Sequence, residues 1–137
     1  AGNRRVNNVS IGVDFSNAYY VKYQRNYVKA GHGERPVLTK SVVHGVKLKP
    51  HLGYYPKQIL AYKALLEFFN ETYGINLECP KASDGKLLTT VDPSVEKGVF
   101  EGVVCHYHLT KRKIDTAGLE LDKIIDQINV LPIGSLD

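Results

Sequence analysis

The chain has no tryptophan, no methionine and only two cysteines among its 137 residues. Two cysteines, Cys79 and Cys105, are too few for the disulfide framework that holds many small secreted domains together. No apolar run approaches the roughly 20 residues that a membrane-spanning helix needs, and the first residues carry no secretory-signal pattern. These absences exclude a disulfide scaffold and a chain that crosses a bilayer. Cys105 lies in an apolar run and is expected to be a small buried residue.

The composition is that of an ordinary globular protein, with 43% hydrophobic and 23% charged residues. A chain of this length can bury one hydrophobic core, so residues 1–137 are expected to form a single domain. The net charge of +4 favours anionic partners such as teichoic acids or nucleic acid. This excess of positive charge is too small to indicate which of these anionic partners the chain binds.

Hydrophobic periodicity predicts several elements. Two short apolar, β-branched segments, residues 9–15 and 100–107, are typical of buried central strands. The clearest helix covers residues 56–73, with Pro56 in its first turn, Gly74 as its C-terminal cap and an apolar stripe. That stripe consists of Ile59, Tyr62, Leu66, Phe69 and Tyr73, widened by Leu65 and Phe68.

The remaining segments give less regular patterns. Residues 18–27 place tyrosines on alternate positions and predict an extended segment with an aromatic face. Residues 37–48 predict one or two short strands broken at Gly45, and residues 80–98 a long loop that could form one wall of a substrate groove. Residues 119–128 predict a final helix whose inward side chains are Leu121, Ile124, Ile125 and Ile128. Residues 1–8 are polar and predict a loop that enters the domain.

The segment that carries most chemistry is residues 102–115, GVVCHYHLTKRKID. Imidazole and carboxylate groups, here His106 and Asp115, suit a zinc ion that keeps one position open for water. Of the two histidines, His106 is the expected ligand and His108 a supporting or solvent-facing residue. His32, His44 and His51 are scattered and are expected to be solvated. A polar strand end without a metal is the plainer interpretation.

An ordered set of motifs resembles the zinc-dependent N-acetylmuramoyl-L-alanine amidases of type 2, whose fold the peptidoglycan recognition proteins share. The matching pieces are residues 8–17 (NVSIGVDFSN), residues 54–58 (YYPKQ) and residues 106–118, with the phage-type lysins most similar. The resemblance implies an α/β fold in which helices flank a mixed central β-sheet. It also implies peptidoglycan as the partner and the bacterial cell wall as the place of action.

The resemblance assigns roles residue by residue. His106 matches the second histidine ligand of the zinc ion and Asp115 the carboxylate ligand. Lys113 matches a lysine that stabilises the developing oxyanion, and Asp14 an acid that acts as general base towards the bound water. The family usually has Glu at that position, and Asp is one methylene shorter. Asn17 matches an asparagine near the groove and is an expected substrate contact.

The sequence departs from the family pattern before residue 8. The family's first histidine ligand lies on a strand well before this motif, and no such strand precedes it here. The expectation is therefore an incomplete zinc site that a preceding segment or a second polypeptide completes. The competing interpretations are a non-catalytic peptidoglycan-binding module and, less favoured, a nucleic-acid binder. The last would use the tyrosines and basic residues of 19–29 with the cluster at 111–113.

Overall fold

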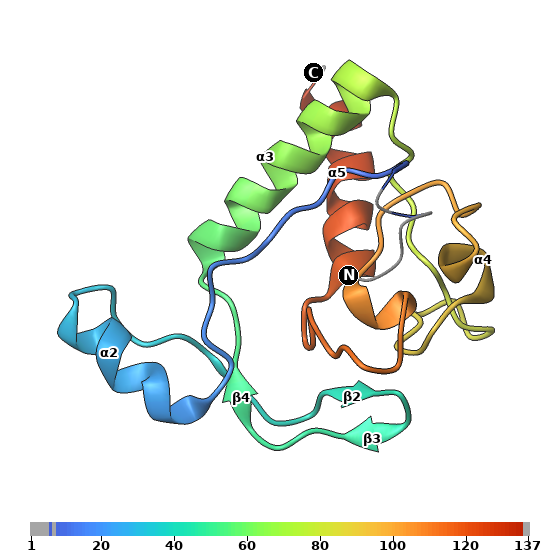
Figure 1. The fold of residues 1–137 in the computed structure, drawn as a ribbon. Coiled ribbons are helices and arrows are strands. Elements are labelled where there is room, and N and C mark those ends of the chain that lie inside the picture. The colour runs from blue at the N-terminus through green and yellow to red at the C-terminus, as the bar shows by residue number, and fades with distance from the viewer. Residues whose placement is uncertain (1–5, 7, 136–137) are drawn as a thin grey trace.

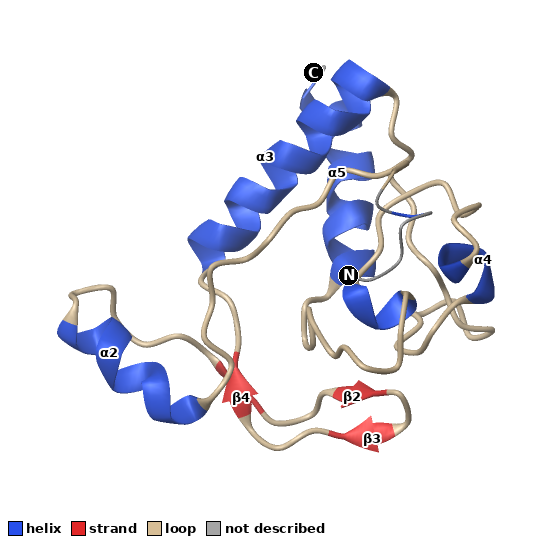
Figure 2. Ribbon diagram, in the orientation of Figure 1, coloured by secondary structure: helices blue, strands red, loops and turns tan. Residues whose placement is uncertain are grey.

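The computed structural model describes residue 6 and residues 8–135, so most of the expected entry loop at residues 1–8 lies outside the described residues. Helices and short irregular segments dominate the architecture (Figures 1 and 2). None of the helices in this part of the chain is long and apolar enough to cross a membrane. The elements, in chain order, are η1 (Val21–Tyr23), α2 (Gln24–Lys29), β1 (Val37–Leu38), β2 (Val42–Val43), β3 (Val46–Lys47), β4 (His51–Leu52), α3 (Pro56–Tyr73), α4 (Pro93–Glu96), η2 (His106–His108) and α5 (Leu121–Ser135).

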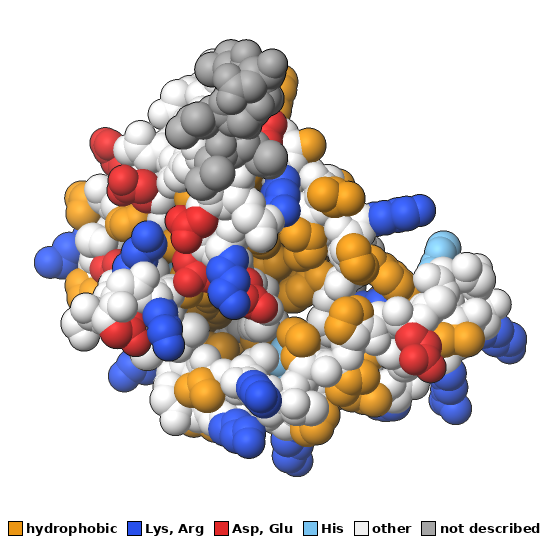
Figure 3. Space-filling model, turned by 180° about the vertical axis from the view of Figure 1, so that it is seen from behind, with side chains coloured by type: hydrophobic (Ala, Val, Ile, Leu, Met, Phe, Trp, Pro, Cys, Tyr) orange, Lys and Arg blue, Asp and Glu red, His pale blue; other side chains and the backbone are white. Residues whose placement is uncertain are grey.

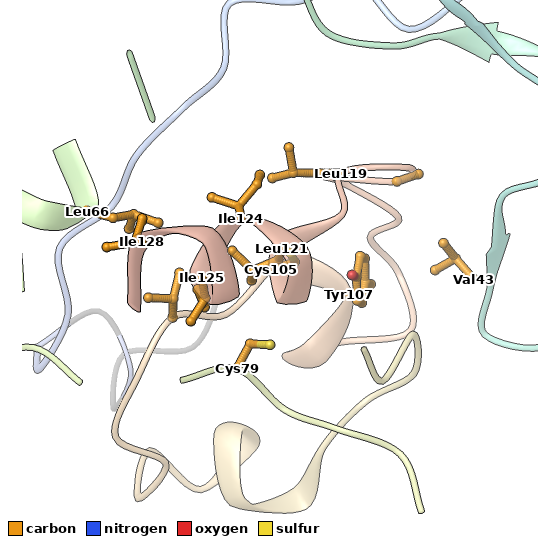
Figure 4. Close-up of a cluster of buried hydrophobic side chains, with 12 residues drawn as sticks. Val43, Leu66, Cys79, Cys105, Tyr107, Leu119, Leu121, Ile124, Ile125 and Ile128 are labelled. Atoms are coloured by element: carbon orange, nitrogen blue, oxygen red, sulfur yellow. The ribbon is translucent and has the colours of Figure 1, made fainter. Parts of the chain in front are cut away.

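The core forms where α5 meets α3 and the segment that leads into η2 (Figure 4). Helix α5 buries one face, and Leu121 at its start is completely inaccessible to solvent. The predicted inward residues of this helix are confirmed, since all four are buried. Other buried members of the cluster are Val43, Leu66, Cys79, Val103, Cys105, Tyr107, Ala117 and Leu119.

The predicted boundaries of α3 are confirmed. Pro56 occupies the first turn, where its missing N–H costs no helical hydrogen bond. The Tyr55 N–H, which also has no partner within the helix, donates to Gln58 Oε1 over 3.0 Å. At the other end Gly74 adopts φ 67°, a left-handed conformation that suits glycine, and its N–H donates to the Asn70 carbonyl.

The predicted apolar stripe of α3 is only partly correct. Leu66 is buried, and Ile59 and Tyr62 pack against the core cluster. Towards the C-terminal end Tyr73 is 63% and Phe68 51% exposed. These two rings contact each other with centroids 6.1 Å apart instead of entering the core. The periodicity describes one face of the helix, but α5 covers only part of that face.

The β-structure consists of two small antiparallel sheets in the described part of the chain. β1 pairs with β4, and β2 pairs with β3 across a turn at His44 and Gly45, which confirms the predicted break at Gly45. Each strand has two residues. The expected mixed central sheet is not found among these residues, so the amidase-like α/β fold stays a prediction.

Residues 9–15, predicted as a central strand, are an unpaired extended segment that runs past α3 and α5 (Figure 1). No backbone hydrogen bond joins residues 11–17 to another described segment. The alternating residues Val9, Ile11 and Val13 are exposed. Residues 100–105 are likewise extended outside any sheet, and Val103 N–H donates to the Glu78 carbonyl. The pattern identified extended backbone correctly, but a strand also needs a neighbouring strand to pair with.

Residues 18–27 are not the extended aromatic segment that the sequence suggested. From residue 21 on they belong to η1 and α2, which project from the body of the protein (Figures 1 and 3). Tyr19, Tyr23 and Tyr27 are four residues apart, a spacing that suits a helix as well as an extended chain. Gln24 fixes α2, since its Nε2 donates to the Arg35 carbonyl and its Oε1 accepts from the Arg35 N–H.

The loop predicted at residues 80–98 is largely irregular, as expected. It contains α4, which begins after Asp92, whose Oδ1 accepts from the Ser94 N–H over 2.9 Å. An isolated bridge joins Lys81 and Leu87. The predicted groove wall is not formed beside the site described below, because no residue of this loop lines that pocket.

Because the first turn of α5 is buried in the core, we expect a cavity made there to reduce stability strongly. We expect Leu121→Ala to lower the free energy of unfolding by about 2–5 kcal/mol, because the leucine is fully buried and its neighbours cannot fill the space completely. Urea unfolding followed by circular dichroism measures this. The matched control is Leu60→Ala on α3, where the side chain is 62% exposed and the expected change is below about 1 kcal/mol. Equal losses in the two variants would contradict this description of the core.

Candidate functional site

The structure brings His106 and Asp115 into direct contact, as the sequence predicted. His106 begins the short helix η2, and Asp115 lies in the loop that leads to α5. The imidazole Nδ1 of His106 meets the Asp115 Oδ2 atom in a hydrogen bond. Both side chains are partly accessible, 34% for His106 and 54% for Asp115. The pair therefore lies at the surface, where an ion or ligand can reach it.

Three interactions hold the loop at residues 115–117 against the core. The Tyr107 N–H donates to the Asp115 carbonyl over 3.2 Å. Cys105 Sγ lies 3.2 Å from Thr116 Oγ1. The Tyr54 hydroxyl donates to the Ala117 carbonyl over 3.1 Å, and burial raises the pKa of this phenol, which keeps its proton in place. The carboxylate of Asp115 is thus presented by a loop fixed on both sides.

A pocket of about 130 Å³ lies between this loop, the extended segment and β4. The extended segment contributes Asp14 and Asn17, and the loop contributes Asp115. Three of the predicted site residues therefore line one pocket, although Asp14 and Asn17 are about a hundred positions from Asp115 in the sequence. Its other lining residues are Val13, Phe15, Tyr19, His51, Leu52, Tyr54, Ile114, Thr116 and Ala117.

Two of the predicted site residues do not line this pocket. One is His106, which contacts the pocket residue Asp115. The other is Lys113. Its side chain is exposed and does not line the pocket. Its backbone is held from the β2–β3 turn, because His44 Nε2 lies 3.0 Å from the Lys113 carbonyl and donates to it. The predicted role of the ammonium group in stabilising an oxyanion stays a prediction.

Of the two positions expected for His108, the solvent-facing one is wrong, because the side chain is completely buried. The two histidines lie on a 3₁₀-helix and not on the strand that the sequence predicted. His108 Nδ1 accepts from the Cys105 N–H over 2.9 Å, and Nε2 donates to the Leu88 carbonyl over 2.7 Å. Both ring nitrogens are used by the fold, and burial lowers the pKa of the imidazole.

His51 was expected to be solvated with the other scattered histidines, and this prediction is wrong. The side chain is 1% exposed and forms part of the pocket wall. Burial lowers its pKa, and a backbone contact with Leu52 opposes this effect. His32, by contrast, is exposed as expected. Sequence reasoning also assigned no role to Tyr54 and Thr116, although they belong to the motifs at residues 54–58 and 106–118.

Neither cysteine is placed as a nucleophile. Both are buried and not bonded to each other, which confirms the prediction for Cys105. Burial raises the pKa of the Cys79 thiol to about 11, and burial also raises the pKa of Cys105. Each sulfur is therefore held as the unreactive thiol at neutral pH.

The donor set at this site suits a zinc ion in kind but not in number. One imidazole and one carboxylate converge, and both are common zinc ligands. Among the described residues no group of three or more His, Cys, Asp or Glu side chains is arranged to hold a metal ion. His106 and Asp115 could supply two protein ligands, and further ligands would come from elsewhere.

Comparisons with models of protein families, with curated proteins and with solved structures give no match for this chain.

The two buried histidines predict a loss of stability in mild acid. The folded-state pKa of each lies below the value of about 6.5 that an unfolded histidine has, so the unfolded chain binds protons that the folded protein does not. The free energy of unfolding should therefore be highest above pH 6.5. It should decrease as the pH falls from there through the folded-state pKa values.

Urea unfolding at a series of pH values between 8 and 5 measures this dependence. We expect His108→Gln to reduce the decrease, leaving the part that His51 contributes, whatever its effect on stability at pH 8. His32→Gln is the control, since this side chain is exposed and should leave the wild-type profile unchanged. If the stability of His108→Gln depended on pH in the same way as that of the wild type, His108 would not be a source of the loss of stability in acid.

Proposed function

We propose that this chain is the metal-binding and substrate-binding part of a zinc-dependent N-acetylmuramoyl-L-alanine amidase that acts on bacterial peptidoglycan. The observation that carries the proposal is the direct contact between His106 and Asp115 beside a pocket that Asp14 and Asn17 also line. The motif resemblance assigned a role to each of these four residues. Their meeting at one place supports the assignment, since residues 14 and 115 belong to segments that are far apart in the chain.

His106 and Asp115 would hold the zinc ion. When bound, zinc lowers the pKa of a coordinated water and polarises the carbonyl of the amide bond. The protein itself contributes a rigid support, because the loop that carries Asp115 is held by Tyr107 and Tyr54. Rigid placement of a ligand reduces the cost of organising the site when the metal binds.

The other residues have roles that follow from their chemistry. Asp14 is exposed at the end of the extended segment, where its carboxylate can accept a proton. Asn17 provides an amide that can bind the peptide part of the substrate. Lys113 is two residues from Asp115, and its exposed ammonium is free to approach a bound anion only if the side chain turns towards the pocket.

A non-catalytic peptidoglycan-binding module is the second candidate. The observation that favours it is the absence of a third metal-ligating side chain near His106 and Asp115 in the part of the chain described. In this case the His106–Asp115 contact is only a hydrogen-bonded pair at the pocket edge. Metal binding separates the two candidates.

Zinc binding is the first test of the amidase proposal. We expect one zinc ion per chain by equilibrium dialysis, bound much more weakly than at a three-ligand site. His106→Ala and Asp115→Ala should each abolish binding, because each removes half of the protein ligands. His32→Ala is the control and should bind zinc as the wild type does, since His32 is exposed and does not line the pocket. Zinc binding that survives both site variants would rule out the assignment.

Cell-wall binding and cleavage are the second test. We expect the isolated chain to sediment with purified peptidoglycan but to release few new L-alanine amino groups, because two protein ligands hold zinc weakly. Asn17→Ala should weaken sedimentation with the wall, and Leu60→Ala, on exposed α3 surface, should not. Failure of the wild-type chain to bind peptidoglycan would contradict both candidates. Rapid release of L-alanine amino groups would contradict the expected weak activity.

A further inference from the structure

The buried imidazole of His51 has one nitrogen in a well-formed hydrogen bond and one without. The Leu52 backbone lies close enough to the ring to raise its pKa but makes no hydrogen bond of good geometry with the second nitrogen. Its ring stacks on Tyr19, with centroids 4.8 Å apart and an interplanar angle of 8°. Nε2 lies 2.8 Å from Ser41 Oγ. Nδ1 is buried and has no hydrogen-bond partner of good geometry. Such an atom is unusual, because most buried polar groups in folded proteins have a hydrogen-bond partner.

A second unpaired atom belongs to the same pocket. Asn17 Oδ1 is also buried without a hydrogen-bond partner, and both residues line the pocket beside Asp115. Two unpaired polar atoms in one pocket wall indicate a ligand or water molecules that complete them. The volume of about 130 Å³ exceeds the roughly 30 Å³ share of a single water molecule and admits a small polar group.

The residues that line the pocket determine which chemical group of a ligand can bind there. Asn17 Oδ1 only accepts hydrogen bonds, so its partner must carry an N–H or O–H. His51 Nδ1 accepts or donates, depending on whether Nε2 or the Ser41 hydroxyl supplies the proton between them. The pocket also contains the carboxylates of Asp14 and Asp115, and no lysine or arginine lines it. An anionic group is therefore disfavoured, and a neutral amide fits both unpaired atoms.

We propose that His51 is a substrate-binding residue whose Nδ1 atom, together with Asn17 Oδ1, holds an amide group of the peptide part of the substrate. The identity of that substrate rests on the proposed function. Tyr19 and Ser41 act on His51 as positioning residues, since they fix the plane of the ring and the direction of its free nitrogen. The peptide is thereby oriented next to the His106–Asp115 pair.

The test measures binding of N-acetylmuramoyl-L-alanyl-D-isoglutamine, with N-acetylmuramic acid as the probe that lacks the peptide. His51→Phe keeps an aromatic ring against Tyr19 but removes both nitrogens. We expect this variant to bind the peptide-bearing probe roughly three- to tenfold more weakly than the wild type, as the loss of one hydrogen bond predicts. Its binding of N-acetylmuramic acid should not change. His32→Phe is the matched control, because His32 is exposed and lies outside the pocket, and it should bind both probes as the wild type does.

A second measurement uses the unaltered chain and so does not depend on how well the variant folds. With ¹⁵N-labelled histidine, the Nδ1 resonance of His51 should shift on addition of the peptide-bearing probe, and the resonances of buried His108 should not. Unchanged affinity in His51→Phe, or an unshifted Nδ1 resonance while the probe binds, would show that His51 is only a core residue whose free nitrogen contacts water. In that case the proposed function would stand. If the wild type binds neither probe, the peptidoglycan proposal itself fails and this inference fails with it.

Discussion

The position of the candidate site depends on how the chain between Cys105 and Ala117 is tied to itself and to α3. Tyr107 is completely buried in the core and its backbone N–H holds the Asp115 carbonyl, so packing and hydrogen bonding act on the same residue. Tyr54, just before α3, reaches the Ala117 carbonyl from the other side. An exposed carboxylate is thereby fixed by buried neighbours. This arrangement lets a surface residue keep a constant position.

The helices could be predicted from the sequence because their signals are local. Pro56 and Gly74 mark the ends of α3, and the spacing of Leu121, Ile124 and Ile128 identifies the buried face of α5. These features need only the geometry of one helix and a core to pack against. The exposed end of the α3 stripe was not predictable in the same way, because it depends on how far α5 extends along its neighbour.

The predictions of central strands were wrong because strand formation depends on a second segment and not on local sequence alone. The sequence of residues 9–15 favours extended backbone, and the backbone is extended, but pairing is a property of two segments. Val9, Ile11 and Val13 alternate with polar or small residues as a half-buried strand would, yet they remain exposed. The prediction of an extended segment at residues 18–27 was wrong because the tyrosine spacing is ambiguous. Positions four apart lie on one face of a helix and also on one face of a strand. At the site, the convergence of His106 and Asp115 was predictable, whereas the buried position of His51 depends on tertiary contacts with Tyr19 and Ser41.

The small contribution of the His106–Asp115 pair to stability indicates whether the pair serves the fold or a ligand. Both side chains are partly exposed, and an exposed ion pair contributes about 0–1 kcal/mol to stability. The fold therefore does not need this pair, in contrast to His108, whose two nitrogens satisfy buried backbone groups. The same reasoning applies inside the pocket, where Asn17 and His51 carry a cost that no neighbouring protein group offsets. Polar groups that cost the folded state more than they stabilise it are best explained by what they bind. Asp115 of this pair lines the same pocket as Asn17 and His51, which is the physical basis for treating it as the functional site.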